Sequence, residues 1–433
     1  MFNFLKGRLI IVRIILLVSV LGLLSFGIST IYSVGHPAEA SVASQTAGLE
    51  NLWKKQVIFA SVGFIGFVAA NLINYRKLGS ISYWLYSIIL LLLLILLISR
   101  YIIPIPFVPE INGTHRWIKI SFAGKSLPAI QPSELCKIVY ILALAWYLRY
   151  RSNYRNFKSL MGPFALTVLP MLMILLEPDL GTVMLMMPVL FTMLFVAGAK
   201  VKHLLVIILM AVLISPLLWM KMADYQKIRI SSVFLQNELI RQKAEEHPLL
   251  GKILVGENFS AKKWESNWGY HLLRSKFAVA SGGLDGYGFR KGPFIKYDFL
   301  PTRHNDFVFS TIAHQWGFKG SLLLFSLYII ILACGLEIAG HNTDPFGRLL
   351  SIGIIAMFTV EVIINISMTV GLMPITGLTL PFVSYGGSSL LVSMIAVGLL
   401  NNVGRCRPFG VARRKQRQTL SLLWAPAPRY SLL

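Results

Sequence analysis

The sequence predicts an all-α polytopic integral membrane protein with about ten transmembrane helices, and three observations carry that prediction. Hydrophobic residues make up 55% of the 433 residues and charged residues only 14%, against roughly 25% charged in soluble domains. Long apolar runs recur along the chain, and basic residues gather in alternate loops. The apolar content excludes intrinsic disorder. The three cysteines, an odd number, exclude a secreted disulfide scaffold.

The expected spans follow from run length, because a helix needs roughly 17–25 apolar residues to cross a bilayer. Nine runs qualify. They are 14–33, 57–73, 81–99, 160–176, 181–199, 204–220, 320–336, 349–372 and 384–403. A tenth run, 135–148, is short and becomes a span if Pro132 opens its helix, since proline suits a first helical turn.

Basic residues predict the orientation, because short cytoplasmic loops are enriched in Lys and Arg. With the N-terminus inside, nineteen basic residues fall in cytoplasmic segments, whereas the outer loop 34–52 has none. Both termini are therefore expected in the cytoplasm. The basic tail 404–433 is expected to be a topology determinant near anionic lipid, with a specific cytoplasmic partner as the alternative.

A large extracytoplasmic loop, 221–306, is expected between spans 7 and 8. The stretch 221–319 holds 15 basic and 9 acidic residues and is too long for the loop-charge rule to apply. Its basic excess suits a phosphate-bearing or otherwise anionic ligand. Within it, 226–246 is partly amphipathic and is expected to lie along the membrane surface.

Ionisable residues inside or beside spans mark candidate cavities, because burying them in lipid is costly. Glu134 and Lys137 are three apart on the fourth helix, so they share a face and can pair. A structural ion pair explains them as well as a site does. Arg116 precedes them in the outer loop. In the turn between spans five and six, Asp179 is expected to cap the next helix, and Glu177 to line an outer cavity.

The segment 365–389, NISMTVGLMPITGLTLPFVSYGGSS, breaks two spans with Pro and Gly. Irregular backbone at membrane depth is tolerated only where it is buried in protein or lines a cavity. The segment is therefore predicted to form part of a site.

Together with Arg116-Trp117 and three further motifs, this segment resembles the signature of the SEDS family (RodA/FtsW/SpoVE), most closely RodA. The three motifs are QPSELCK at 131–137, EPDLGT at 177–182 and FLPTRHNDFVF at 299–309. The resemblance implies one SEDS-type membrane domain, 1–433, in the bacterial cytoplasmic (inner) membrane. It implies a peptidoglycan glycosyltransferase that polymerises lipid II on the outer face, for cell-wall elongation and cell shape. It also implies a class B penicillin-binding protein, a transpeptidase, as partner.

The resemblance also implies site residues. Asp306 matches the family's essential outer-loop aspartate and is expected to be the catalytic base. The expected substrate-binding residues are Arg116, Glu134, Lys137, Asp298, Arg303, Ser384, Tyr385, Gly386, Gly387 and Ser388. Thr302 stands where the family often has Glu, so this chain has no second carboxylate at that position near Asp306. Glu361 stands where the family usually has Gln.

The implied reaction is attack by a lipid II hydroxyl on a lipid-linked donor sugar, which expels undecaprenyl diphosphate. A carboxylate base within about 3 Å would speed this by roughly 10²–10⁴-fold. The alternative for Asp306 is that it caps the following helix. Arg116, Lys137 and Arg303 are the expected cations facing the diphosphate. A divalent cation, Mg²⁺ or Mn²⁺, would also screen it, although no His, Cys and Asp cluster marks a metal site.

Two other functions fit parts of the pattern. Intramembrane Glu134, Lys137 and Glu361 with broken helices also suit a flippase or transporter of a lipid-linked precursor. A non-catalytic scaffold for the transpeptidase is the second alternative. The expected partners include the undecaprenyl-linked glycan strand and membrane lipid. Nucleic-acid binding is not predicted, because the basic residues are dispersed among loops.

Overall fold

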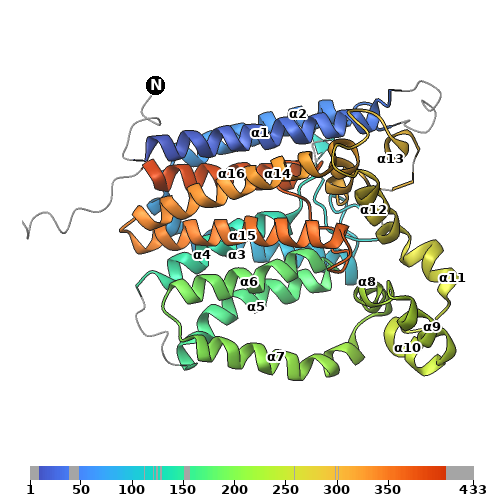
Figure 1. Ribbon diagram of the computed structural model, residues 1–433. Coiled ribbons are helices and arrows are strands. Elements are labelled where there is room, and N and C mark those ends of the chain that lie inside the picture. The colour runs from blue at the N-terminus through green and yellow to red at the C-terminus, as the bar shows by residue number, and fades with distance from the viewer. Residues whose placement is uncertain are drawn as a thin grey trace, which may run out of the picture.

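Long apolar helices run side by side in one bundle (Figure 1). The computed structural model describes residues 9–38, 48–111, 113–119, 121–122, 125–126, 129–150, 157–257, 259–297, 299–300 and 302–405. Residues 406–433 of the predicted basic tail therefore lie outside the described residues.

Eight helices in the described part of the chain are long and apolar enough to cross a membrane. They are α1 (Ile10–Gly35), α2 (Leu52–Leu72), α3 (Tyr75–Tyr101), the 3₁₀ turn η3 (Phe157–Leu160) continued by α5 (Met161–Leu176), α7 (Val201–Lys221), α14 (Val308–His341), α15 (Pro345–Thr369) and α16 (Gly387–Arg405). The all-α multi-span fold is confirmed. The prediction of ten spans is met only in part, because α4 (Pro132–Leu148) and α6 (Leu180–Val196) have 17 residues each.

Both short helices nevertheless pack inside the bundle. α4 contacts α3 and α15, and α6 contacts α5 and α15. Pro132 is the first residue of α4, as the sequence predicted. Both ends of the described chain meet at one end of the bundle, where Arg13 Nε donates to Asn401 Oδ1 over 2.7 Å.

Helix α14 begins twelve residues before the predicted apolar run at 320. Its first turns are buried by protein rather than lipid, so hydropathy alone does not reveal them. Gly317 interrupts the helix with φ 60° and ψ −154°. A Cβ there would lie 2.5 Å from the backbone nitrogen of Gly286, so the close approach of the two chain segments requires glycine.

The segment 221–306 is mostly helical and gathers at the other end of the bundle (Figure 1). Its elements are α8 (Asp224–Phe234), α9 (Glu238–Glu246), α10 (Pro248–Val255), α11 (Ala261–Lys263), the π-helical turn η4 (Trp264–Trp268), α12 (Tyr270–Ser281) and α13 (Pro293–Lys296). The stretch 226–246 forms two helices because Asn237 caps α9 by accepting from Leu239 N over 2.9 Å. A short antiparallel pair, β1 (Ser121–Phe122) and β2 (Lys125–Ser126), lies between α3 and α4 in sequence.

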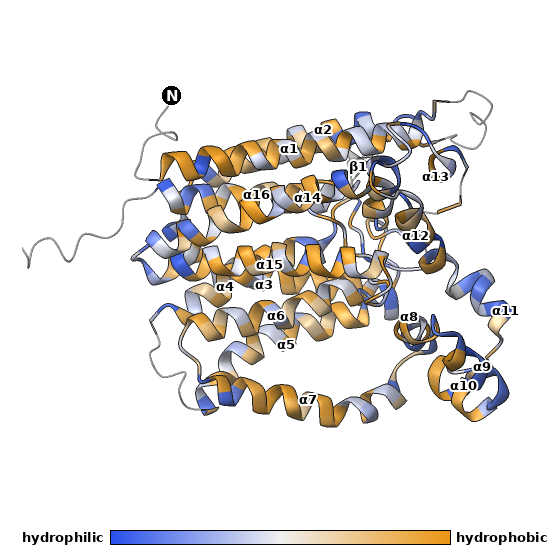
Figure 2. Cartoon of the chain, in the orientation of Figure 1, coloured by the Kyte–Doolittle hydropathy of each residue, from blue (hydrophilic) through white to orange (hydrophobic). Residues whose placement is uncertain are grey.

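Helix α7 lies at the edge of the bundle and is apolar along its length except at its two ends (Figure 2). Of its residues, only Leu204 is buried. A helix with an apolar surface all round and so little protein contact requires a lipid environment. The hydropathy of α7 thus supports the membrane assignment independently of the bundle core.

Candidate active site

A cavity of about 390 Å³ opens at the end of the bundle where α8 to α13 gather. Its walls come from the starts of α4, α6 and α16, the turn before α14 and the irregular segment 370–386. Seven of the predicted site residues line it. They are Arg116, Glu134, Asp306, Tyr385, Gly386, Gly387 and Ser388. The structure therefore brings together motifs that lie up to 272 positions apart in the sequence.

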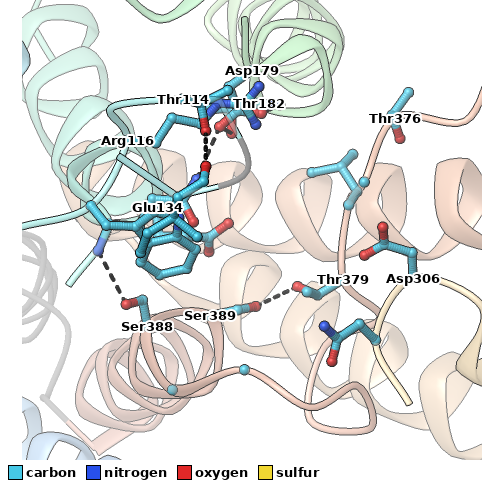
Figure 3. A pocket seen from close by; sticks show the side chains of 18 of the residues that line it. Thr114, Arg116, Glu134, Asp179, Thr182, Asp306, Thr376, Thr379, Ser388 and Ser389 are labelled. Carbon is cyan, nitrogen blue, oxygen red and sulfur yellow. Dashed lines mark hydrogen bonds between the residues drawn. The ribbon is translucent and has the colours of Figure 1, made fainter. Parts of the chain in front are cut away.

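Asp306 lies in the turn before α14, with its carboxylate directed into the cavity (Figure 3). Asn365 Nδ2 donates to the carbonyl of Asp306 over 3.1 Å and to that of Leu378 over 2.6 Å. These bonds fix the turn against α15 and the irregular segment. The N-cap of α14 is Phe307, which has no side-chain cap bond, and no described residue bonds the Asp306 carboxylate. The helix-cap alternative is therefore not supported.

Burial raises the pKa of the Asp306 carboxyl to about 6, and the Arg229 guanidinium opposes this shift. Arg229 extends from α8 and lines the same cavity. A base is most effective when its pKa lies near the working pH. At neutral pH Asp306 is thus ionised yet more basic than an exposed aspartate.

Arg116 lies on the opposite wall from Asp306 (Figure 3). Its guanidinium donates to the carbonyl oxygen of Glu177 over 2.6 Å, and to that of Pro178. These bonds fix the loop before α4 onto the turn between α5 and α6. Burial lowers the pKa of Arg116, and the positive charge of Arg229 lowers it further. The guanidinium groups of Arg116 and Arg229 therefore lie close enough in this one cavity to repel each other.

Asp179 caps α6, as predicted. Its carboxylate accepts from the backbone nitrogen of Thr182 over 3.3 Å and from the Thr182 hydroxyl over 3.0 Å. It also accepts from Ser133 Oγ over 2.8 Å, which joins α6 to the start of α4. Asp179 also lines the cavity, so the residue that caps α6 is at the same time part of the cavity wall.

Glu177 does not line this cavity, which corrects the sequence expectation. Its side chain is buried, with 1% of the residue exposed. Neither carboxyl oxygen has a hydrogen-bond partner among the described residues. Burial, with a smaller contribution from Asp179, raises the pKa of Glu177 to about 9. Glu177 is consequently a neutral carboxylic acid at pH 7.

Replacing Glu177 by Gln is expected to stabilise the protein at pH 7. The folded state holds Glu177 protonated up to about pH 9, whereas the unfolded chain ionises it near 4.5. Stability is therefore lost as pH rises between these values, by about 3 kcal/mol at pH 7. Thermal melts from pH 5 to 9 should show a higher melting temperature and a flatter profile for the variant. A lower melting temperature with an unchanged slope would contradict this.

Lys137 is held between two carboxylates under the cavity wall. Its Nζ lies 2.7 Å from Glu134 Oε2 and 2.6 Å from Glu361 Oε1, and its side chain is 1% exposed. The predicted pairing with Glu134 is confirmed. Lys137 is not among the residues that line the cavity, contrary to the expectation that it faces the diphosphate. A buried ammonium needs compensating charge, and Glu361 on α15 adds a second carboxylate to that of Glu134.

Arg303, Ser384 and Asp298 complete the account of the predicted residues. Arg303 does not line the cavity. Its Nη1 instead donates to the carbonyls of Phe294 and Tyr297 over 3.0 and 2.8 Å, so its expected contact with the diphosphate is corrected to a role in holding the loop. Ser384 Oγ, also outside the cavity wall, donates to the Asn305 carbonyl over 2.8 Å. Asp298 lies outside the described residues.

The comparison with protein families rests on nearly the whole chain. The family model described as cell cycle protein, which covers FtsW, RodA and SpoVE, matches residues 13–407. The chain belongs to this FtsW/RodA/SpoVE (SEDS) family. The resemblance predicted from the motifs is confirmed.

Individual relatives agree with the family assignment. The chain is 30% identical to the peptidoglycan glycosyltransferase RodA of Treponema pallidum, over 90% of this chain and 96% of that protein. It is 32% identical to stage V sporulation protein E of Bacillus subtilis, over 81% and 86%.

Two solved structures share the fold. A chain from a peptidoglycan synthase complex that coordinates polymerization and crosslinking superposes with a TM-score of 0.66 at 26% identity, over 90% of this chain and 96% of that one. The rod shape determining protein RodA of Thermus thermophilus superposes with a TM-score of 0.58 at 26% identity, over 90% and 95%.

Sequence reasoning missed Arg229 in this SEDS chain. It comes from α8, for which the only sequence indication was a partly amphipathic pattern, and that pattern does not say which side chain faces a cavity. Among the described residues, no group of three His, Cys, Asp or Glu side chains is placed to hold a metal ion.

Proposed function

We infer that this SEDS chain is a peptidoglycan glycosyltransferase that polymerises lipid II into glycan strands. The observation that carries this function is the Asp306 carboxylate, which is directed into a cavity that also holds Arg116 and Arg229. The relatives named as peptidoglycan glycosyltransferases support the activity, including RodA of Treponema pallidum. The similar rod shape determining protein RodA of Thermus thermophilus supports a role in cell shape, and we propose that the polymer serves cell-wall elongation.

Asp306 accepts the proton of the attacking acceptor hydroxyl. The hydroxyl oxygen forms a bond to the anomeric carbon of the donor sugar as the bond from that carbon to the diphosphate oxygen breaks. Negative charge develops on the departing undecaprenyl diphosphate. Fixed cations stabilise this charge more in a partly desolvated site than they would in water. Arg116 and Arg229 are the guanidinium groups that line this cavity. Arg229 can bind two phosphate oxygens at once, whereas Arg116, which already donates to the carbonyls of Glu177 and Pro178, contributes mainly its charge.

The topology belongs to the same proposal. Counting α4 and α6 gives ten spans, since 17 helical residues cover about 25 Å and helices can cross where the bilayer thins locally. With both termini cytoplasmic, the segment 221–306 and the cavity lie on the outer face of the bacterial cytoplasmic membrane, where lipid II is consumed. The basic tail 404–433 then lies in the cytoplasm.

The proposed partner is a class B penicillin-binding protein, a transpeptidase. The similar chain solved within a peptidoglycan synthase complex for polymerization and crosslinking supports this pairing. Coupled enzymes would pass the new strand from one active site to the other.

The direct test is polymerisation of purified lipid II by the purified chain with its transpeptidase, read as a ladder on a gel, with Mg²⁺, with Mn²⁺ and with chelator. We expect polymer. A folded complex that makes none, but moves a lipid-linked precursor across a vesicle membrane, would favour the flippase instead. Absence of both activities, with intact complex formation, would favour the scaffold.

Replacing Arg229 by Gln is expected to weaken binding of the lipid-linked donor and to shift the pH profile. Arg229 lowers the pKa of Asp306, so its loss should raise that pKa and move the acidic limb of activity to higher pH. We expect KM to rise about tenfold, because a charge-assisted bond contributes about 1.5–3 kcal/mol. Initial rates across lipid II concentration and pH check both effects. An unchanged KM and an unchanged limb would remove Arg229 from the site.

A further inference from the structure

A second cavity, of about 300 Å³, lies where α3 and α15 begin and α4 ends. We call it the inner-end cavity. Arg76, Trp146, Arg149 and Asp344 are among the residues that line it. The active-site cavity lies at the opposite end of α4, beside Gln131. Because a helix rises 1.5 Å per residue, the two cavities are roughly 20–25 Å apart. The inner-end cavity is therefore a separate site.

The wall of the inner-end cavity is aromatic and closely packed. Phe346 meets Trp146 edge to face, with ring centroids 5.1 Å apart, and stacks on Tyr75 at 6.0 Å. A Cβ at Gly79 would lie 2.3 Å from Trp146 Cε3, so Trp146 is seated directly against the backbone of α3. The rings are fixed before any ligand arrives, which lowers the entropic cost of binding.

The single carboxylate of the cavity is already engaged within the protein. Asp344 Oδ2 accepts from the Tyr75 hydroxyl over 2.8 Å and from Arg76 Nε over 3.2 Å. Asp344 Oδ1 accepts from Phe346 N over 3.3 Å and so caps α15. Asp344 is the only acidic residue among those that line the cavity. Its negative charge offsets the positive charge of Arg76, so the positive charge of Arg149 has no carboxylate to offset it among these lining residues.

Arg149 supplies the uncompensated charge. Its guanidinium stacks over the ring of Trp146 and over that of Tyr150, 4.4 Å from the Tyr150 centroid. No salt bridge joins it to a carboxylate of any described residue. A guanidinium stacked on aromatic faces keeps its N–H groups free along its edge, where they can bind two oxygens of a phosphate. The described residues that line the inner-end cavity, with two arginines and one aspartate, thus carry a net charge of about +1.

Two aromatic residues of the inner-end cavity are of the kind typical of a membrane–water interface. Trp146 is in the last turn of α4, and Tyr150, 78% exposed, follows that helix. Trp and Tyr are enriched where membrane meets water. Basic pockets between spans at that depth bind lipid head groups. We propose that the inner-end cavity binds the phosphate of an anionic phospholipid, which Arg149 contacts while Trp146 and Tyr150 pack against the glycerol and the first acyl carbons.

The test titrates the full chain, purified in a neutral detergent, with phosphatidylglycerol, with phosphatidylcholine and with inorganic phosphate. Bound lipid is counted by native mass spectrometry, and the melting temperature is recorded in parallel. We expect phosphatidylglycerol to bind and to raise the melting temperature, and the other two to do neither. Arg149→Gln should weaken phosphatidylglycerol binding about fivefold or more, since one interfacial Arg contributes about that much.

Two variants make the result specific. Arg348→Gln removes an exposed charge from the same end of the bundle, one turn into α15 and outside the cavity, and should leave binding unchanged. Arg149→Lys keeps the charge and should bind better than Arg149→Gln, which separates charge from folding. Equal losses in Arg149→Gln and Arg348→Gln would mean a diffuse surface effect and overturn the proposal. So would equal binding of phosphatidylcholine, or equal protection by inorganic phosphate.

Discussion

Replacing Asp306 by Asn is expected to lower the rate of lipid II polymerisation by about 10²- to 10⁴-fold, because Asn cannot accept the proton of the acceptor hydroxyl. The change keeps the shape of a side chain whose carboxylate makes no bond to a described residue, so folding should be preserved. The measurement is the initial rate of polymer formation by the complex with its transpeptidase, with a thermal melt to check folding.

Asp285→Asn is the matched control. Asp285 also belongs to the segment 221–306, but its side chain is 73% exposed, pairs with Lys319 and is outside the cavity. It should retain the wild-type rate. Equal activity of Asp306→Asn and Asp285→Asn would remove Asp306 as the base.

The wild-type pH profile tests the same assignment independently. Burial raises the pKa of Asp306 to about 6, so the ionised base is lost as pH falls through that value. Activity should therefore decline below about pH 6 rather than near pH 4, where an exposed aspartate titrates. In Asp306→Asn, the residual rate should lack this limb.

The spans and the main motifs could be predicted because their determinants are local. A run of apolar residues identifies a span without knowledge of its neighbours, and Pro132 marks the start of α4 by its own backbone preference. The Asp179 cap depends on Thr182, three residues away. Where a feature is determined within one helical turn, the sequence was sufficient.

The errors concern side chains whose partners are distant in sequence. The spacing of Glu134 and Lys137 predicts their pair, but Glu361, which also holds Lys137, is 224 positions away. Arg303 was expected to face the diphosphate because it lies three residues before Asp306. The turn directs it instead to the carbonyls of Phe294 and Tyr297. Proximity in sequence does not determine the direction of a side chain in an irregular loop.

The largest expected effect on stability concerns Lys137 and the two carboxylates that hold it, Glu134 and Glu361, which we call the Lys137 triad. Replacing Lys137 by Met should destabilise the protein by about 3–5 kcal/mol, because it leaves Glu134 and Glu361 buried without their shared cation. Glu361→Gln should cost less, since Lys137 keeps its contact with Glu134 at 2.7 Å. Adding Glu361→Gln to Lys137→Met should recover part of the loss, because one of the two uncompensated carboxylates is then removed.

Thermal and denaturant unfolding of the two single variants and the double variant form a cycle that measures this coupling. Lys319→Met is the control, because Lys319 pairs with Asp285 at the surface, with 75% of its side chain exposed. Such pairs contribute about 1 kcal/mol or less. If Lys137→Met were no more destabilising than Lys319→Met, the triad would not be a stabilising element. If the double variant were no more stable than Lys137→Met, the buried carboxylates would not be the cause. The expected recovery instead identifies charge compensation as the reason that Lys137 is held between Glu134 and Glu361.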